Sequence, residues 1–551
     1  MDFLLVSLNA KYIHSCLALY SLKSYINDEN ANIIIKEYTI NNTIESIVAD
    51  IYRTKIKIVC FSLYIWNIEQ SLDVINMLKK AAPEISIIAG GPEADGVIGS
   101  PNIDIAVLGE GEITFSRLVS YFLYGQLSLQ SIKGASYKQG GQVFINEGAD
   151  AVALDDIPFV YKSLLGFEDR IIYYEASRGC PFNCQYCLSS AMPGVRYLSL
   201  GRVFSDLSFF LDNTVKQVKF VDRTFNSNPD LAYKIWGFLI ENDNGHTNFH
   251  FEVAADLLTE KQLCLLKKAR KGLFQFEAGV QSTNKETLEA IKRKTDLNKL
   301  FDNVRKLKSY GNIHQHLDLI AGLPYENFAS FKKSFNDVAA LRPGQLQLGF
   351  LKVLKGAGII GSGFEIVYNE KAPYEVIFTK WLSYDDILAL KMIEEAVELF
   401  YNSNRFENSL NYIIKFFDTP FDFFYQLGQY WLNNSFNLKK HNKLFMNTAL
   451  FEFGETVSGL DMGLFKDLIK FDILLNENIK SFPDLFLNPL GREEKAAASK
   501  LKRIHGQCNI EKFEYNVLGS YEKLASYILF TYGGENIAFD ITAQFVSMVG
   551  N

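Results

Sequence analysis

Residues 177–187 read SRGCPFNCQYC, and the three cysteines of this stretch lie within eight residues of one another. Cys180, Cys184 and Cys187 directly follow an apolar run that is typical of a β-strand. Thiolates at these spacings can wrap a small loop around an iron–sulfur cluster. A structural zinc site needs four ligands, and no Cys or His follows at a suitable distance. The pattern therefore favours iron–sulfur chemistry over zinc.

The other four cysteines, Cys16, Cys60, Cys264 and Cys508, are isolated in the sequence. Each is expected to be a small buried apolar residue rather than a ligand. Seven cysteines in 551 residues are also too few and too scattered for a disulfide framework. Because only three thiolates are available, a 4Fe-4S cluster here would keep one iron free to bind a substrate.

The cysteine loop begins a region in which predicted strands alternate with helical patterns. Six such βα units favour an open or partial barrel. The candidate strands lie within residues 170–179, 215–225, 248–258, 273–282, 314–324 and 345–355.

Polar and apolar residues alternate along these strands. His250 and Glu252 share one face of their strand, whereas Phe249 and Phe251 share the other. If helices bury the outer face, the polar residues point inward, and a polar lumen indicates a substrate or cofactor cavity. The alternative is that some of these strands lie at an edge and expose their polar face to water.

The first 120 residues alternate short β-branched runs with amphipathic helices, which predicts a doubly wound parallel sheet. Ligands of such sheets bind beyond the carboxyl ends of the strands. The first strand-to-helix turn, NAKYIH, lacks the glycines of a dinucleotide site, so a nicotinamide cofactor is disfavoured. The strand ends are predicted at residues 9–12, 62–67, 90–93 and 109–112.

The predicted fold class is α/β with three domains. A glycine-rich segment around residues 133–150 predicts a hairpin followed by a linker, and the chain becomes helical and aromatic after about residue 375. The expected parts are a doubly wound, Rossmann-like domain, a linker, a partial (β/α)6 barrel and a mainly helical C-terminal domain, at residues 1–140, 141–165, 166–372 and 373–551.

Composition limits the partners. The 56 Lys and Arg against 63 Asp and Glu give a formal net charge of −7, so there is no general electrostatic case for nucleic-acid binding. No apolar run approaches the roughly 18 residues that a membrane helix needs. The N-terminus MDFLLVSLNAKY has neither a basic start nor a cleavage site, and a cytoplasmic protein is expected.

The cysteine spacing at the end of the first barrel strand resembles that of the radical S-adenosylmethionine (SAM) superfamily, over residues 165–355. The resemblance implies a 4Fe-4S cluster on Cys180, Cys184 and Cys187 whose free iron chelates SAM. It further implies that Tyr186 lies against the adenine, Glu277 near the ribose and Gly322 near the base. The cofactor contacts that it implies in the barrel are Tyr186, Asp222, Glu277, Gln281, Asp318 and Gly322.

The N-terminal domain resembles the cobalamin-binding domain that precedes the barrel in one large branch of that superfamily. The matching segments are YIHSCLAL, FSLYIWN, IIAGGPEAD and VLGEGEITF. The usual D-x-H-x-x-G signature is missing, so no histidine of that motif ligates cobalt, and His14 is expected at the start of a helix. Tyr64 to Asn67 would lie under the corrin, and the glycine-rich turns would hold the nucleotide tail. The implied contacts are Asn9, Tyr12, Ser62, Tyr64, Trp66, Asn67, Gly90, Gly91, Pro92, Glu93, Gly109, Glu110, Gly111 and Glu112.

The two resemblances together imply a cobalamin-dependent radical SAM enzyme. Its commonest reaction is methylation of an unactivated carbon through methylcobalamin and a 5′-deoxyadenosyl radical, with electrons from an external donor of the flavodoxin or ferredoxin type. A cyclisation or other rearrangement fits the same residues, as does a non-catalytic corrinoid-binding sensor. A methylthiotransferase is disfavoured, because the N-terminal domain offers only Cys16 and Cys60 for a second cluster. No pattern identifies the substrate or a catalytic residue beyond the cysteines.

Overall fold

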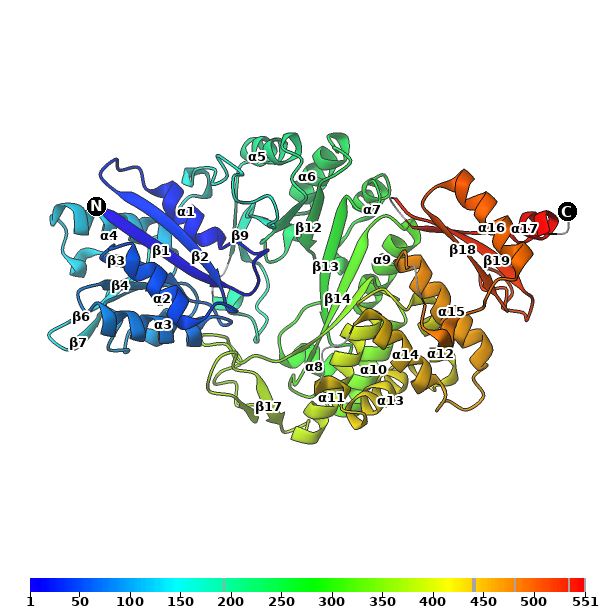
Figure 1. Cartoon of the computed structure of the whole chain (residues 1–551). Helices are drawn as coiled ribbons and strands as arrows, with labels where there is room; N and C mark the ends of the chain where they lie inside the picture. Colours follow the sequence, from blue (N-terminus) through cyan, green and yellow to red (C-terminus); the bar gives the residue numbers. More distant parts are fainter. Residues whose placement is uncertain (192–193, 439–441, 480–481, 534–535, 550–551) are drawn as a thin grey trace. The chain divides into compact units, whose positions relative to one another are not determined.

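The computed structural model describes residues 1–191, 194–438, 442–479, 482–533 and 536–549 (Figure 1). The chain divides into two compact units. The first consists of Met1–Phe328 with Gly349–Ser383, and the second of Ala329–Leu348 with Tyr384–Asn551. In the described part of the chain, every helix is too short or too polar to cross a membrane.

The first unit begins with a seven-stranded sheet in the order β2-β1-β3-β4-β5-β6-β7. The first five strands pair in parallel, and a hairpin adds the last two antiparallel at one edge. This confirms the doubly wound sheet and the hairpin that the sequence predicts. The strands are Asp2–Asn9 (β1), Asn32–Thr39 (β2), Ile58–Ser62 (β3), Ser86–Gly90 (β4), Ile105–Val107 (β5), Ala135–Gln139 (β6) and Gln142–Ile145 (β7).

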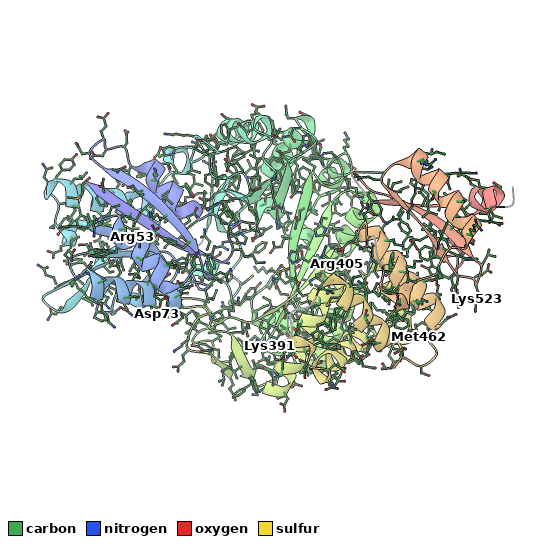
Figure 2. All side chains as sticks on the ribbon, in the orientation of Figure 1. Arg53, Asp73, Lys391, Arg405, Met462 and Lys523 are labelled. Carbon is green, nitrogen blue, oxygen red and sulfur yellow. The ribbon has the colours of Figure 1, made fainter. Side chains whose placement is uncertain are left out.

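Helices cover both faces of this sheet. Apolar residues of α2 and α3 pack on one face, and those of α1 and α4 pack on the other. The charged side chains on the outer sides of the helices, such as Arg53 and Asp73, are exposed (Figure 2). The order β2-β1-β3 places the topological switch point between β1 and β3, where ligands of this fold bind. The helices are Leu17–Tyr25 (α1), Ile44–Arg53 (α2), Ile68–Ala81 (α3) and Gly111–Tyr124 (α4).

The barrel region forms a six-stranded sheet in the order β15-β14-β13-β12-β11-β8, so the predicted partial barrel is confirmed. A short antiparallel pair, β9 with β10, carries the first cysteine. The strands are Ile172–Tyr174 (β8), Ser177–Cys180 (β9), Gly194–Tyr197 (β10), Gln217–Phe220 (β11), Asn248–Glu252 (β12), Phe274–Gln281 (β13), His314–Ala321 (β14), Gln345–Phe350 (β15), Ile366–Tyr368 (β16) and Val376–Thr379 (β17). The helices are Leu200–Asp212 (α5), Pro229–Glu241 (α6), Glu260–Leu266 (α7), Lys285–Ala290 (α8), Leu297–Tyr310 (α9) and Phe328–Ala339 (α10).

Aromatic side chains form the outer core of the barrel. Phe251 packs against Phe220 at 4.4 Å between ring centroids, and Trp236 of α6 packs against Phe276 at 5.3 Å. These four rings are buried. Because the aromatic face lies under a helix, the alternating polar residues of the same strands point to the opposite side, which confirms the predicted polar lumen.

The second unit begins with aromatic helices and ends in a three-stranded antiparallel sheet, in the order β18-β19-β20. The sequence predicts a mainly helical domain here. The missed strand β19 is buried on both faces, by α15 on one side and by α16 and α17 on the other, so it reads as a continuous apolar run. The elements are Tyr384–Ala396 (α11), Glu407–Ile413 (α12), Pro420–Asn433 (α13), Lys443–Gly454 (α14), Met462–Asn476 (α15), Arg492–His505 (α16), Cys508–Phe513 (β18), Ser526–Thr531 (β19), Ile537–Asp540 (β20) and Thr542–Val549 (α17).

The isolated cysteines behave as predicted with one exception. Cys16, Cys60 and Cys508 are buried, but Cys264 is exposed. Cys264 lies on the outer side of the short helix α7, whose buried residues are Gln262, Leu263 and Leu266. The prediction of a buried residue is therefore wrong for Cys264, because helical phase and not residue type sets its exposure.

A buried carboxylate anchors two helices of the second unit. Asp472 of α15 accepts hydrogen bonds from the backbone N–H groups of Asn408 and Ser409, at 3.0 and 2.8 Å. It also accepts from the side chains of both residues. These donors belong to the first turn of α12, whose N–H groups have no partner within the helix.

Asp472→Ala is expected to lower the free energy of unfolding by about 3 kcal/mol, because it leaves buried N–H and O–H donors unpaired. Urea unfolding of the full chain measures this change. Asp484→Ala removes an exposed aspartate of the same unit and serves as the control. Equal midpoints for the two variants would show that Asp472 has no such role.

Candidate functional site

The three predicted cluster cysteines share one loop at the end of β9. Cys180 and Cys184 are buried and Cys187 is half-buried. All seven cysteines lie in the described ranges, and none of them forms a disulfide. The Gln185 N–H donates to Ile291 O at 2.9 Å, and Gln185 O accepts from the Ile359 N–H at 2.7 Å. These bonds fix the loop against two other parts of the barrel region.

Gly179 fixes the path of the chain into this loop. Its φ is +108°, and a Cβ atom at this position would lie 2.2 Å from the backbone oxygen of Gly194 on β10. That distance is a clash with backbone that no side-chain movement relieves. The glycine of the SRGC motif is therefore required by the close pairing of β9 with β10.

Arg293 lies beside the cluster loop, and the sequence analysis missed it. Its Nη1 lies 3.9 Å from Cys184 Sγ and donates to Tyr186 Oη at 3.2 Å, and its Nη2 donates to Gly279 O. Burial raises the pKa of the Cys184 thiol, and Arg293 opposes this effect. A guanidinium at this position stabilises negative charge on the sulfur atoms. No motif marks Arg293, which follows a short helix in the run KRKTD.

Asp222, a predicted cofactor contact, is buried at the end of β11. Its carboxylate accepts hydrogen bonds from the Ala176 N–H at 3.0 Å and from the Ser177 hydroxyl. Burial raises its pKa to about 7. The structure therefore gives Asp222 a role in holding the turn between β8 and β9, and its contact with SAM stays a prediction.

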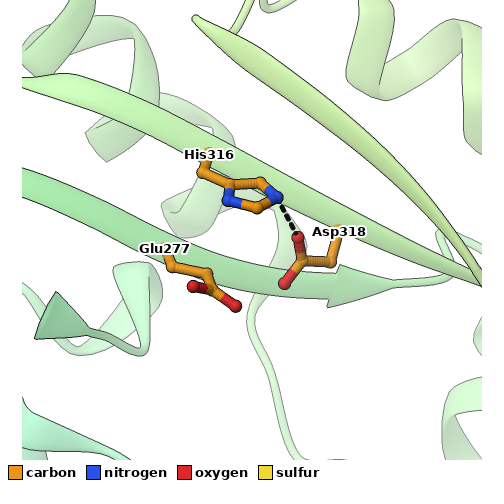
Figure 3. A group of neighbouring side chains, drawn as sticks. All are labelled: Glu277, His316 and Asp318. Atoms are coloured by element: carbon orange, nitrogen blue, oxygen red, sulfur yellow. Dashed lines mark ion pairs between the residues drawn. The ribbon is translucent and has the colours of Figure 1, made fainter. Parts of the chain in front are cut away.

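Charged side chains from four neighbouring strands meet inside the barrel. Glu277 Oε2 lies 3.2 Å from Lys219 Nζ and 3.0 Å from His250 Nε2. On the next strand, His316 Nε2 lies 2.9 Å from Asp318 Oδ1 (Figure 3). Glu277 was predicted near the ribose of SAM, a role that no contact of this structure tests.

Burial and neighbouring charges shift several pKa values in the lumen. Burial raises the pKa of Glu277, but the contact with His250 and the charge of Lys219 outweigh it and lower that pKa to about 2. Burial and the neighbouring Glu277 charge raise the pKa of Glu252 to about 7. Burial also lowers the pKa of His250. The lumen therefore combines the strongly acidic Glu277 with Glu252, a carboxyl group whose pKa lies near neutral pH.

Two predicted contacts lie at strand ends with unusual backbone. Gln281 ends β13 with a φ of +70°, next to a register shift in the pairing with β14, and its buried Oε1 has no hydrogen-bond partner. Gly322 follows β14 with a φ of +89°, where a Cβ atom would lie 2.8 Å from Val376 Cγ1. A positive φ is strained for Gln281 but not for glycine, and strained positions concentrate at ligand sites.

The carboxyl edge of the N-terminal sheet carries aromatic side chains. Tyr64 and Trp66 follow β3 and stack with their ring centroids 4.4 Å apart. Trp66 is 47% exposed, and Tyr12, which follows β1, is 64% exposed. Large exposed aromatic rings beside the switch point are a ready contact surface for a flat ligand.

Glycines and an exposed proline shape the neighbouring turns of this edge. Gly91 has a φ of +99°, and a Cβ atom there would lie 2.5 Å from Leu63 O. Gly109 has a φ of +80°, and Pro92 is exposed. Gly90 ends β4, and Gly111 is the first residue of α4. The chain can approach a ligand closely at these turns because side chains are absent.

Several residues at this edge that were predicted to contact cobalamin make hydrogen bonds within the protein. Asn67 donates to Leu8 O and Ser62 O, at 3.0 and 3.1 Å, and accepts from the Tyr64 N–H at 2.8 Å. Asn9 donates to Glu37 at 2.9 Å and to His14 O at 3.0 Å. The hydroxyl of Ser62 accepts a contact from Cys16 at 3.6 Å. These three buried side chains hold the loops that form the edge.

Glu93 and His14 are also engaged. Glu93 is buried and accepts a hydrogen bond from the Tyr374 hydroxyl at 2.7 Å. His14 Nδ1 lies 2.6 Å from the hydroxyl of Tyr173 on β8. His14 precedes α1, which begins at Leu17, so its predicted place before a helix is confirmed.

The glutamates of the predicted nucleotide-tail turn instead contact arginines of the barrel region. Arg178 of β9 lies 3.1 Å from Glu110, 3.0 Å from Glu112 and 2.7 Å from Glu175. Arg196 of β10 also pairs with Glu110. The β9–β10 pair is thus bound to the start of α4. Arg178 lies inside the SRGC stretch, two residues before Cys180. Its pairing with Glu110 and Glu112 could not be read from the sequence, because only the fold brings these two segments together.

Three protein families match this chain in comparisons with known sequences. The family described as B12 binding domain matches residues 4–119, and the Radical SAM superfamily matches residues 174–338. A family described as Protein of unknown function (DUF4080) matches residues 362–530. The chain therefore carries a B12 binding domain followed by a radical SAM domain.

Curated relatives match about half of this chain. The cobalamin-dependent radical SAM methyltransferase TokK of Streptomyces tokunonensis is 27% identical over 316 residues, which are 50% of this chain and 44% of TokK. The chain thus spans about half the length of the curated relatives that it matches.

Solved structures share the fold. The cobalamin-dependent S-adenosylmethionine radical enzyme OxsB aligns with a TM-score of 0.58 and 15% identity, over 92% of this chain and 75% of OxsB. The methyltransferase TsrM of Kitasatospora setae aligns with a TM-score of 0.56 and 14% identity, over 65% of this chain and 76% of TsrM. The chain is homologous to cobalamin-dependent radical SAM methyltransferases and has their α/β architecture.

Arg178→Met is expected to lower the free energy of unfolding by about 3 kcal/mol, because it leaves buried and partly buried carboxylates without their cation. Arg117→Met removes an exposed arginine that pairs with Asp150 at 3.4 Å, and should cost about 1 kcal/mol or less. Urea unfolding of both variants measures the difference. A loss for Arg178→Met no larger than that of the control would contradict this role.

Proposed function

We propose that this protein is a cobalamin-dependent radical SAM enzyme that methylates an unactivated carbon. The observation that carries the proposal is the pairing of Arg178, two residues before the first cluster cysteine, with Glu110 and Glu112 of the B12 binding domain. This contact joins the stem of the cysteine loop to the carboxyl edge at which a ligand of the doubly wound sheet binds.

The cysteine loop suits a 4Fe-4S cluster that takes SAM as its fourth ligand. Cys180, Cys184 and Cys187 are free thiols of one short loop, and the Arg293 guanidinium faces Cys184. Tyr186 is held in the same place by its hydrogen bond from Arg293. When they are bound, the cluster supplies one electron to cleave SAM, and cobalamin supplies the methyl group.

The residues of the chain itself would orient SAM and exclude water from the lumen. Gly322 and Gln281 lie at the ends of β14 and β13, where their positive-φ backbone would bring main-chain groups close to SAM. The aromatic core on the outer face keeps water out of the lumen from that side. A dry cavity protects a reactive radical from stray hydrogen donors.

The proposed cobalamin surface is the aromatic and glycine-rich edge of the first sheet. Trp66 and Tyr12 offer exposed rings for the corrin, and the turns at Gly91 and Gly109 offer close approach for the nucleotide tail. Because Glu110 and Glu112 are paired with arginines, we assign them to the contact with the barrel and not to the tail.

Further parts of the proposal concern partners and organisation. An external reductant of the flavodoxin or ferredoxin type would supply electrons in the cytoplasm. The substrate would enter the polar lumen. The domain boundaries after residues 140, 165 and 372 belong to this proposal as well.

Substitution of all three cluster cysteines by alanine is expected to abolish cleavage of SAM and the visible absorbance of the cluster. Anaerobic reconstitution with iron and sulfide, followed by mass spectrometry of the products, measures both. Cys264→Ala, an exposed cysteine outside the loop, is the matched control. Cobalamin binding without any SAM cleavage by the reconstituted wild-type protein would instead indicate a sensor.

The products of SAM distinguish the reactions. Methyl transfer gives S-adenosylhomocysteine together with 5′-deoxyadenosine, because one SAM donates the methyl group and a second forms the radical. With substrate present, 5′-deoxyadenosine alone would contradict methylation and favour a cyclisation or other rearrangement.

Trp66→Ala is expected to weaken hydroxocobalamin binding about tenfold, which corresponds to the loss of one exposed aromatic contact. Tyr52→Ala is the control, because Tyr52 is 43% exposed but lies on α2, close to where β3 begins. Titration followed by visible absorbance measures both affinities. Unchanged binding by Trp66→Ala would remove Trp66 from the cobalamin surface.

A further inference from the structure

Glu277, His316 and Asp318 form a compact group inside the barrel (Figure 3). One potential ligand atom from each of them lies within 4.8 Å of the other two. Glu277 on β13 and His316 on β14 are directly paired residues, and Asp318 follows on the same face of β14. We propose that these three side chains bind a divalent metal ion of the first transition row, separate from the cysteine cluster.

The chemistry of the donors selects the class of metal. Two carboxylates and one imidazole suit Mn²⁺, Fe²⁺ or Zn²⁺, whereas the soft thiolates of the cysteine loop suit an iron–sulfur cluster. Three protein ligands on adjacent strands also leave coordination positions open toward the lumen. An oxygen or nitrogen atom of a substrate could take one of these positions and be held inside the barrel.

His250 supplies an independent observation that points to a ligand. Its side chain is only 8% exposed and points at the same group, with Nε2 3.0 Å from Glu277 Oε2. The geometry of this contact does not make a hydrogen bond, so a buried imidazole nitrogen is left without one. Buried polar atoms normally have a hydrogen-bond or metal partner, and an ion held by Glu277, His316 and Asp318 would offer one to His250 Nε2 as a fourth ligand.

Lys219 is the natural competitor for this site. Its ammonium lies 3.2 Å from Glu277 Oε2 and neutralises the carboxylate that would bind the metal. A divalent ion must displace that ammonium or remain close to it, and both weaken metal binding. The proposal therefore requires that removal of the lysine charge strengthens binding, whereas removal of a ligand weakens it.

The probe is Mn²⁺, added anaerobically to the full-length protein with its oxidised cluster in place, so that the thiolates are occupied. Free aqueous Mn²⁺ gives a six-line electron paramagnetic resonance signal that is lost on binding to protein, and the remaining signal gives the affinity. Loss of this signal requires no SAM cleavage, so the result is separate from the test of the proposed function.

The ligand variants are His316→Ala and Asp318→Asn. Because even the residues behind metal ligands contribute about 10–100-fold to affinity, loss of a ligand should weaken Mn²⁺ binding by about 100-fold or more. Lys219→Met should strengthen binding by about tenfold or more. His246→Ala, an exposed histidine of a loop, should leave binding unchanged. Cluster absorbance and hydroxocobalamin binding check that each variant is folded.

Weaker binding by both ligand variants together with stronger binding by Lys219→Met would support the metal site, and would assign Glu277 to the metal in place of the ribose of SAM. The proposal is wrong if the six-line signal keeps its full intensity with excess Mn²⁺ and wild-type protein. It is also wrong if His316→Ala and Asp318→Asn bind Mn²⁺ as tightly as the wild type, or if Lys219→Met binds it no more tightly.

Discussion

The ion pairs of Arg178 are the interaction on which the arrangement of the first unit depends. One guanidinium lies within 3.1 Å of three carboxylates, two from the B12 binding domain and one from its own strand region. Such a group is costly to bury unless every charge has a partner, and Arg196 supplies a second cation to Glu110. Because Arg178 belongs to the strand that ends in Cys180, the same contact that joins the two domains also fixes the start of the cysteine loop.

Hydrophobic periodicity was sufficient to predict most of the fold. Strands β1 to β5 are short apolar runs between amphipathic helices, and the barrel strands alternate phenylalanine with polar residues. Strand β19 was missed because its apolar run lies between two other strands, without the alternating amphipathic helices that marked β1 to β5. The prediction also failed for Cys264, whose exposure depends on the phase of a short helix.

The candidate site, like the fold, could be predicted only in part from the sequence. The cysteines could be predicted because their spacing is local in the sequence, and the structure brings them into one loop. Asn9, Asn67 and Glu93 were predicted as ligand contacts from their place at strand ends, but their polar atoms are engaged by the protein. Arg293 and the pairing of Arg178 with Glu110 and Glu112 could not be predicted, because they depend on contacts between segments that are far apart in the sequence.

The pairing of Glu110 and Glu112 with Arg178 and Arg196 limits how this protein can be recombined. A chimera that takes its B12 binding domain from a relative would place foreign side chains opposite both arginines. Unless that relative carries acidic residues at the same two positions, Arg196 would lose its carboxylate partner and Arg178 would keep only Glu175. These two domains should therefore be inherited, and engineered, as a single module.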